Sequence, residues 1–398
     1  DGEFADPDLR GMAIPCQIHI RDGWMALVHL THFVVIDTAS SNIPRIAWQQ
    51  SLKAAGISTA ELVQPRTRNR RLHPVGQVIG LTRETVIYSI GSKLVAGDLE
   101  TGRLAWSRQD VISNQVSGSA DDRVVAVRTD GSVTLVRTLD GSRIARRTFR
   151  NGTPLWNDGA LWLLQRTTAN GLTFELRNYE QDVAVWTRDC PAETEVTMVE
   201  DDDDLAFLEP TGRMTMVRWA DGSERYHTDL PLKLGAQEKS WFTVQRSEGR
   251  DIVMGGETYS HRVGMQVVPF DNSGQQTAVP FDGHVCGVSN SDGKLLWSTT
   301  VVKASFDRTQ PADLPVLLLA SRQLDIRNAG NPFQQRFRMT AKVIDKRTGR
   351  EIYFTEEPAA LLPPRIEPDP EHGRIVINFH EWQLDITFPD SDKAKSEK

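Results

Sequence analysis

The sequence predicts an all-β fold, a single β-propeller with four-stranded antiparallel blades. Three observations predict it: short apolar runs recur about every 40 residues, a glycine-to-aromatic spacing repeats down the chain, and helical periodicity is nearly absent. Many short strands separated by glycine-rich turns at a regular period are typical of propellers. A β-solenoid would need shorter and more uniform rungs, and a pair of β-sandwiches would not repeat the glycine-to-aromatic spacing.

The apolar runs indicate how many blades to expect. We expect each run to open a blade and to be followed by strands that become more polar outward, as in "RVVAVRTDGSVTLVRTLDGSRIARRTF". Eight blades are therefore favoured, and seven are the alternative. The runs begin near Met25, Val86, Val124, Leu161, Leu205, Ile252, Val316 and Ile375.

The domain organisation follows from the same pattern. Residues 1–388 are expected to form the propeller, with insertions at about 54–80 and 264–283, and the charged tail 389–398 is expected to be disordered. Only Gln49 to Val63 could hold a turn or two of helix. The last unit has two recognisable strands, so we expect a segment around Ile14 to Ile20 to complete a blade with the C-terminal strands, which would remove free sheet edges.

One stretch, "AGDLETGRLAW", shows what the repeated spacing does locally. An aspartate at the end of a strand, here Asp98, can accept hydrogen bonds from the backbone amides that follow it, and Gly102 can supply the positive φ that closes a short hairpin with a bulge. Trp106 then lies on the returning strand. The stretch therefore predicts a hairpin that carries an anchoring aromatic ring.

Partial copies of this stretch recur further along the chain. One copy keeps the aspartate, threonine, glycine and an aromatic residue: Asp345, Thr348, Gly349 and Tyr353. Two copies keep the glycine and an aromatic residue: Gly293 with Trp297, and Gly222 with Tyr226. One copy has lost the glycine and keeps Asn178 with Trp186.

Ala96, Asp98, Thr101, Gly102 and Trp106 match the A-x-D-x-x-T-G-x-x-x-W docking motif, so the chain resembles the pyrroloquinoline-quinone-like (PQQ-like) propeller repeat family. In that family the tryptophan packs between adjacent blades and the Asp-Thr-Gly turn receives it. The resemblance therefore implies that these residues, together with their partial copies, are structural docking residues.

The resemblance also bears on chemistry. Quinoprotein dehydrogenases of this type hold PQQ with a Ca²⁺ ion and a catalytic aspartate and, in many cases, a disulfide between adjacent cysteines. The three cysteines here, Cys16, Cys190 and Cys286, are far apart. The chain is thus more similar to non-enzymatic members, such as the propeller lipoprotein of the outer-membrane β-barrel assembly machinery and exported planctomycete proteins. This likeness implies a periplasmic or extracellular location.

Composition and motifs point to no catalytic, cofactor or metal site. The formal net charge of −7 argues against a nucleic-acid binder. The acidic run Glu200 to Leu205 lacks the turn glycine of a calcium loop and is expected to be a solvated loop. His380 and Glu381 lack the second histidine of a zinc motif. The cysteine spacing excludes a zinc ribbon and a disulfide scaffold, and it leaves one long-range bridge open.

The sequence thus predicts a non-catalytic scaffold that binds protein partners, or other domains of the same polypeptide, through its two insertions. It predicts no bound nucleic acid and no membrane span. A PQQ- and Ca²⁺-dependent dehydrogenase is the alternative. An intracellular WD40 scaffold is disfavoured because no repeat carries the paired Gly-His and Trp-Asp blade signatures.

Overall fold

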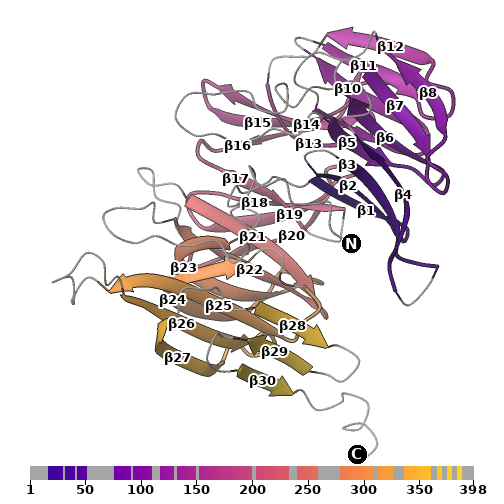
Figure 1. Ribbon diagram of the computed structural model, residues 1–398. Coiled ribbons are helices and arrows are strands. Elements are labelled where there is room, and N and C mark those ends of the chain that lie inside the picture. Colours follow the sequence, from indigo (N-terminus) through magenta and orange to yellow (C-terminus); the bar gives the residue numbers. More distant parts are fainter. Residues whose placement is uncertain are drawn as a thin grey trace, which may run out of the picture. The chain divides into compact units, whose positions relative to one another are not determined.

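The computed structural model (Figure 1) consists of antiparallel β-strands joined by turns, with no helix among the residues it describes. The chain divides into two compact units, Asp1–Asp189 and Cys190–Lys398. The described residues are 17–29, 32–40, 43–51, 76–90, 93–109, 117–129, 132–148, 152–199, 203–232, 240–258, 278–307, 310, 312–325, 336–359, 365–369, 374–378 and 383–387.

The first unit contains four sheets, and each is formed by four consecutive strands paired in chain order. The strands are β1 (Gln17–Arg21), β2 (Trp24–His29), β3 (His32–Asp37) and β4 (Arg45–Ser51); β5 (Gly76–Leu81), β6 (Thr85–Ile90), β7 (Lys93–Asp98) and β8 (Leu104–Arg108); β9 (Ser117–Ala120), β10 (Val124–Thr129), β11 (Ser132–Arg137) and β12 (Arg143–Thr148); β13 (Thr153–Asp158), β14 (Leu161–Thr168), β15 (Gly171–Asn178) and β16 (Val183–Cys190).

The second unit contains a four-stranded, a seven-stranded and a three-stranded sheet among its described residues. The strands are β17 (Glu195–Met198), β18 (Asp204–Leu208), β19 (Arg213–Arg218) and β20 (Glu224–Asp229); β21 (Ser240–Ser247), β22 (Arg250–Glu257), β23 (Ala278–Ser289), β24 (Leu295–Asp307), β25 (Val316–Asp325), β26 (Arg336–Asp345) and β27 (Glu351–Ala359); β28 (Arg365–Asp369), β29 (Arg374–Asn378) and β30 (Gln383–Thr387).

The seven-stranded sheet explains why the blades can be counted in two ways. Its halves are joined by a single residue pair, Phe306↔Leu319, between β24 and β25. Two of the predicted apolar runs, in β22 and β25, therefore share one sheet. The described residues form seven hydrogen-bonded sheets that contain eight apolar runs.

The predicted position of the apolar runs within a blade is wrong for the first six runs and for the last, each of which lies in the second strand of its sheet. The run at Val124 begins β10, which pairs with β9 on one side and β11 on the other, so it is the second strand of its sheet. The preceding strand was missed because it is short and has no apolar run: β9 reads Ser-Gly-Ser-Ala. A run buried on both faces therefore marks a central strand and does not mark the start of a unit.

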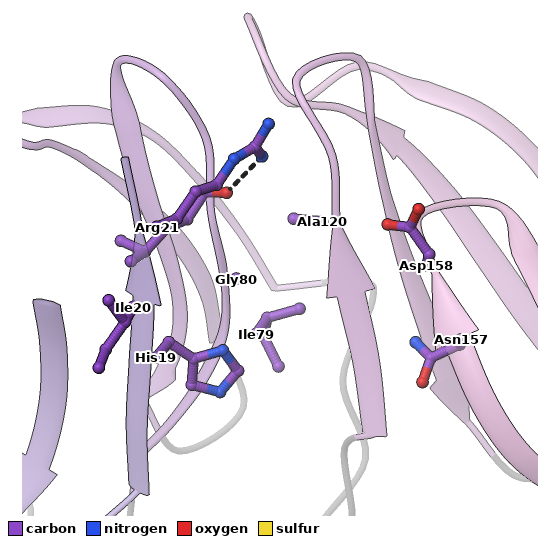
Figure 2. Close-up of a pocket in the computed structure, with 9 residues that line it drawn as sticks. His19, Ile20, Arg21, Ile79, Gly80, Ala120, Asn157 and Asp158 are labelled. Atoms are coloured by element: carbon purple, nitrogen blue, oxygen red, sulfur yellow. Dashed lines mark hydrogen bonds between the residues drawn. The ribbon is translucent and has the colours of Figure 1, made fainter. Parts of the chain in front are cut away.

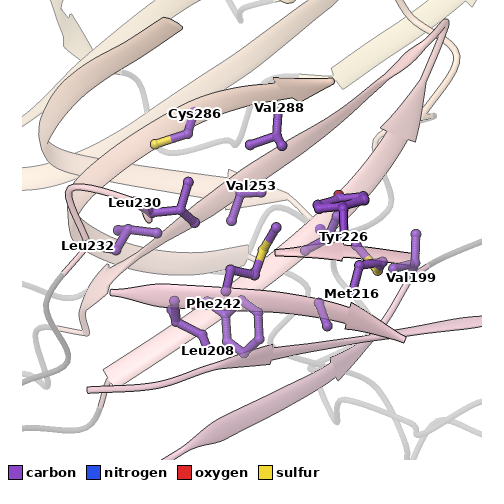
Figure 3. Packing of buried hydrophobic residues seen from close by; sticks show 13 residues of the cluster. Val199, Leu208, Met216, Tyr226, Leu230, Leu232, Phe242, Val253, Cys286 and Val288 are labelled. Carbon is purple, nitrogen blue, oxygen red and sulfur yellow. The ribbon is translucent and has the colours of Figure 1, made fainter. Parts of the chain in front are cut away.

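Successive sheets within each unit are held together by apolar side chains. In the first unit, one buried cluster joins the first and second sheets, a second joins the second and third, and a third joins the third and fourth. In the second unit, Figure 3 shows Tyr226 and Met216 of one sheet packed with Phe242, Val253 and Cys286 of the next. Burial of these side chains between sheets drives the stacking.

The strands bear on the predicted insertions, the N-terminal segment and the predicted helix. Residues 76–80 lie in β5 and residues 278–283 lie in β23, so the described parts of the two predicted insertions are strands. Residues 17–21 pair with β2 as part of the first sheet, so the described part of the N-terminal segment does not complete a C-terminal blade. Residues 49–51 end β4, and the remainder of the predicted helix lies outside the described residues, as does the tail 389–398.

Candidate functional site

The repeated turns share one backbone geometry. The Gly102 N–H donates to the Asp98 carbonyl at 2.9 Å, and the Gly349 N–H donates to the Asp345 carbonyl at 2.8 Å. Both glycines have positive φ, +67° and +69° respectively. The same bond and the same sign of φ occur at three further turns, which contain Gly141, Gly222 and Gly293.

The aspartate and threonine of the motif stabilise their own turn. The Asp98 carboxylate accepts hydrogen bonds from the Thr101 N–H at 2.8 Å and from the Thr101 hydroxyl at 2.7 Å. The hydroxyl bond is the largest of the effects that lower the pKa of Asp98 below its ordinary value. Thr348 donates to Asp345 in the same way, at 3.1 Å. These polar groups are therefore used within the turns.

The aromatic residues whose contacts are described dock on the turn of the next sheet in the chain or, for Trp297, on the turn between β26 and β27 in the other half of the seven-stranded sheet. The Trp106 indole N–H donates to the Thr138 carbonyl at 2.6 Å, and its ring covers Gly141, where a Cβ would lie only 2.7 Å from Cδ2. Trp297 docks in the same way, with its indole N–H 3.2 Å from the Lys346 carbonyl and its ring over Gly349. In both cases the accepting carbonyl belongs to the residue three positions before the glycine.

The docking partner of Gly102 is Trp48, which the sequence analysis missed. Its indole N–H donates to the Leu99 carbonyl at 2.9 Å, and a Cβ on Gly102 would lie 2.6 Å from its ring. Trp48 follows Asp37 by eleven positions, whereas Trp106 follows Asp98 by eight, so the longer loop hid the spacing. The stretch "DTASSNIPRIAW" between two strands was the available signal.

Tyr226 replaces tryptophan at the equivalent place in the second unit. Its ring covers Gly293, where a Cβ would lie 2.7 Å from Cδ2. Its hydroxyl donates to the Asp251 carboxylate on β22, which is fully buried. Burial, followed by the charge of Asp251, raises the pKa of Tyr226 above its ordinary value, so the phenol stays protonated as the donor.

The remaining motif residues have structural positions. Ala96 is buried and pairs with Trp106 across β7 and β8, and Tyr353 pairs with Val343 across β26 and β27. Trp186 is half-buried in β16. A register shift lies beside the aromatic position in six hairpins, and it places the bulged residue directly before the aromatic position.

The hairpin without a glycine has a physical explanation. Asp182 takes the glycine position and has a φ of +58°, which aspartate tolerates better than most residues. The preceding sheet has Ala145 where other sheets have an aromatic residue. Since no large ring at that position has to fit over the turn, residue 182 needs the positive φ but does not need to lack a Cβ.

Replacing Gly141 by alanine is expected to lower the free energy of unfolding by about 2–4 kcal/mol, because the new Cβ adds left-handed strain and a clash with Trp106. Gly249 is a matched control, since its φ is +67° and nothing lies within 4 Å of an added Cβ. Gly249→Ala should cost only about 1 kcal/mol. Urea denaturation measures both, and equal losses at the two positions would contradict the clash.

A buried ionic network lies between β18, β20, β21 and β22. Arg246 donates from Nη1 to Asp204 at 2.8 Å and from Nε to Asp251 at 2.8 Å, and Arg225 also pairs with Asp204. Asp204 is 2% exposed, so the predicted solvated loop at Glu200–Leu205 is wrong at this residue. The aspartates of a charge run can be buried when arginines from neighbouring strands neutralise them.

A cavity of about 440 Å³ lies along the first strands of the four sheets in the first unit. Figure 2 shows His19 and Arg21 on the β1 side and Asn157 and Asp158 on the β13 side, with Gly80 and Ala120 between them. The Arg21 guanidinium donates to the Leu81 carbonyl at 2.8 Å and pairs with Asp122 at 3.2 Å. Burial lowers the pKa of His19, so its imidazole is neutral at pH 7.

These lining residues do not fit a calcium-bound quinone. Calcium takes about six to eight oxygen ligands, whereas the side chains that line this cavity offer oxygens only from Asn157 and Asp158. In the described part of the chain, His, Cys, Asp and Glu side chains form no group of three or more that could hold a metal ion. Cys190 and Cys286 are free thiols in buried positions, so they form no bridge with each other, and Cys16 lies outside the described residues.

Several other residues and segments singled out from the sequence cannot be placed in a site. His380 and Glu381 lie outside the described residues, as do residues 54–75 and 264–277 of the predicted insertions. No helix capable of spanning a membrane is found in the described part of the chain.

Comparison with known proteins gives a family match. The model of the family described as "Outer membrane protein assembly factor BamB" matches residues 43–272 of this chain, which is more than half of its length. No curated protein sequence matches.

Solved structures with similar chains include three different proteins. BamB from Moraxella catarrhalis has 16% identity and a TM-score of 0.42, covering 93% of this chain and 95% of that one. Hsv2 from Kluyvelomyces marxianus has 9% identity and a TM-score of 0.42, covering 87% and 97%. A europium-containing methanol dehydrogenase has 11% identity and a TM-score of 0.38, covering 90% and 81%.

Proposed function

The chain belongs to the PQQ-like propeller repeat family of the outer membrane protein assembly factor BamB, and from this membership we propose that it is a non-catalytic propeller that binds protein partners outside the cytoplasm. The observation that carries the proposal is the use made of the motif residues. Asp98 and Thr101 bond within their own turn, and Trp106 bonds to the next sheet. The polar groups of the repeat therefore stabilise its own turns, and its aromatic groups hold neighbouring sheets together.

The architecture suits binding because hydrogen-bonded sheets packed against one another form a preorganised support. A preorganised surface loses little conformational freedom when a partner docks, so more of the contact energy appears as affinity. Loops on a rigid scaffold are the usual place for such contacts. The contact elements in this proposal are the parts of the two predicted insertions, 54–80 and 264–283, that lie outside the described residues, namely 54–75 and 264–277.

The family description supports the location and the kind of partner. Its named member is an assembly factor of outer-membrane proteins, so we place this chain in the periplasm or outside the cell, similar to exported planctomycete propeller proteins, with protein partners or further domains of its own polypeptide.

The binding proposal is tested by in-cell crosslinking of the tagged full-length protein, followed by mass spectrometry. One variant replaces residues 54–75 and 264–277 with short Gly-Ser linkers, and a control variant lacks only residues 389–398. We expect the linker variant to lose its specific crosslinked partners and the control to keep them. Unchanged partners in the linker variant would show that residues 54–75 and 264–277 are not the contact elements.

The proposal that the protein is non-catalytic has a separate test, because a PQQ- and Ca²⁺-dependent dehydrogenase is the alternative. The purified protein is incubated with PQQ, Ca²⁺, an alcohol or aldose and an artificial electron acceptor. The donor set around His19, Asn157 and Asp158 supports the expectation of no turnover. Turnover above a no-protein control would overturn the non-catalytic assignment.

A further inference from the structure

The outer strand of the third sheet, β12, differs in charge from the outer strands of the other three sheets in its unit. It reads Arg-Ile-Ala-Arg-Arg-Thr and has no acidic residue. The hairpin Ser132–Thr148 contains four arginines and one aspartate, whereas the whole chain has a formal net charge of −7. Positive charge is therefore concentrated locally on an acidic protein.

Arginines on the other outer strands are used within the fold. Arg45 on β4 pairs with Asp37 at 3.3 Å, and Arg108 on β8 donates to the Gly141 carbonyl at 2.6 Å. β16 carries Asp189 as well as Arg188, so the strand has no net charge. By contrast, neither Arg143 nor Arg147 has an ion pair among the described residues, and Arg146 contacts only the Ser132 hydroxyl, at 3.2 Å from Nε.

The arginines lie on both faces of β12. Ala145 packs against the apolar cluster shared with the fourth sheet, and side chains alternate along a strand, so Arg147 shares the face of Ala145. Arg146 points to the opposite face, where it reaches Ser132. The Arg147 Nε is buried and has no hydrogen-bond partner among the described residues, so the sheet leaves this nitrogen unsatisfied.

Among the described strands, one side of the β12 backbone has no pairing partner. β12 is the end strand of its sheet and pairs only with β11 among the described strands, from Ser132↔Thr148 to Val136↔Arg143. An end strand with free N–H and C=O groups can accept one more strand. Ile144, 37% exposed, and Leu139, 76% exposed, add apolar surface to the same hairpin.

We propose that β12 binds an acidic extended polypeptide segment of a partner protein by strand addition, with Arg143, Arg146 and Arg147 pairing with its carboxylates. Opposite charges on directly paired strands attract at short range, while backbone hydrogen bonds supply affinity. This inference deepens the proposed scaffold function and rests on it. It adds a third contact element, separate from residues 54–75 and 264–277.

The experiment uses the full chain and a fluorescein-labelled ten-residue peptide of alternating glutamate and valine, with binding measured by fluorescence anisotropy. The double variant Arg143→Glu with Arg146→Glu should bind this peptide at least about tenfold more weakly, because two attractions become repulsions. The control variant Arg213→Glu with Arg218→Glu changes the net charge equally on exposed positions of β19 and should stay within about twofold of the unmodified protein.

Variants of the peptide make the test independent of whether the protein variants fold. Peptides with glutamine or lysine in place of glutamate should bind at least about tenfold more weakly to the unmodified protein. Backbone N-methylation at every second residue gives two isomers, and only one should lose binding because a strand pairs through one edge.

Three results would overturn the proposal: no binding of the glutamate–valine peptide, equal binding of both N-methylated isomers, or a ten-nucleotide oligothymidine that binds as tightly as the peptide. The last result would indicate a general anion surface. The first result, no binding of the peptide, would indicate that the arginines only protect the edge from pairing. Each of these failures leaves the crosslinking result with the loop variant unaffected, so the two proposals fail separately.

Discussion

Replacing Arg246 by alanine is expected to lower the free energy of unfolding by about 3–5 kcal/mol, the range typical of breaking a buried ion pair. Arg246 contacts both oxygens of Asp251, at 2.8 Å from Nε and 3.2 Å from Nη2, and it also contacts Asp204 at 2.8 Å. Both aspartates are at most 2% exposed. Without Arg246, Asp251 would keep only the Tyr226 hydroxyl as a side-chain donor within the described part of the chain, so a buried charge would lose its compensation.

The measurement is urea denaturation of the full chain at pH 7. Arg213→Ala is the control, because Arg213 lies on the neighbouring β19 and is exposed, and its loss should change the free energy of unfolding by no more than about 0.5 kcal/mol. Arg246→Lys should give an intermediate loss, since lysine keeps the charge and lacks the planar fork that reaches two carboxylates. If Arg246→Ala cost no more than Arg213→Ala, the network would have no structural role.

Replacing Trp106 by alanine is expected to lower the free energy of unfolding by a similar amount, about 3–5 kcal/mol, as for other buried tryptophans. Trp106 is 8% exposed and belongs to the apolar cluster that joins the second and third sheets. Its removal also takes away the donor to the Thr138 carbonyl and uncovers Gly141. One substitution therefore removes apolar packing, a hydrogen bond and the ring that covers the Gly141 turn, all at the boundary between the second and third sheets.

Leu104 provides the control for this second prediction. It lies on the same strand, β8, two residues before Trp106, and is 65% exposed. Leu104→Ala should change the free energy of unfolding by no more than about 0.5 kcal/mol. Equal effects of the two substitutions in urea denaturation would mean that the aromatic residue does not join the sheets.

The turns were largely predictable from the sequence because their determinants are local. Asp98, Thr101 and Gly102 are within five consecutive positions, and the structure uses them in the expected Asx-type turn with positive φ and a neighbouring bulge. The same reasoning located the incomplete turns at Gly222 and Gly293. A turn that depends on a few adjacent residues leaves its signal in a few adjacent letters.

Other features could not be predicted because they depend on distant residues. Asp204 belongs to a run that looks solvated, yet Arg246, 42 positions away, lets it be buried. The first strand of the third sheet, β9, carries small polar residues and no apolar run, so only its pairing with β10 reveals it. The cavity lined by His19, Asn157 and Asp158 collects residues from strands that share no motif.

By itself, the sequence determined that this protein is an all-β chain of repeated hairpins with glycine turns and spaced aromatic residues, since these are short-range properties of the backbone. Only the tertiary structure decided that Trp48 meets Gly102, that Trp106 meets Gly141, and that Tyr226 donates to Asp251. The physical reason is that a hairpin positions its aromatic ring, while the stacking of the next sheet determines which turn and which buried charge that ring contacts.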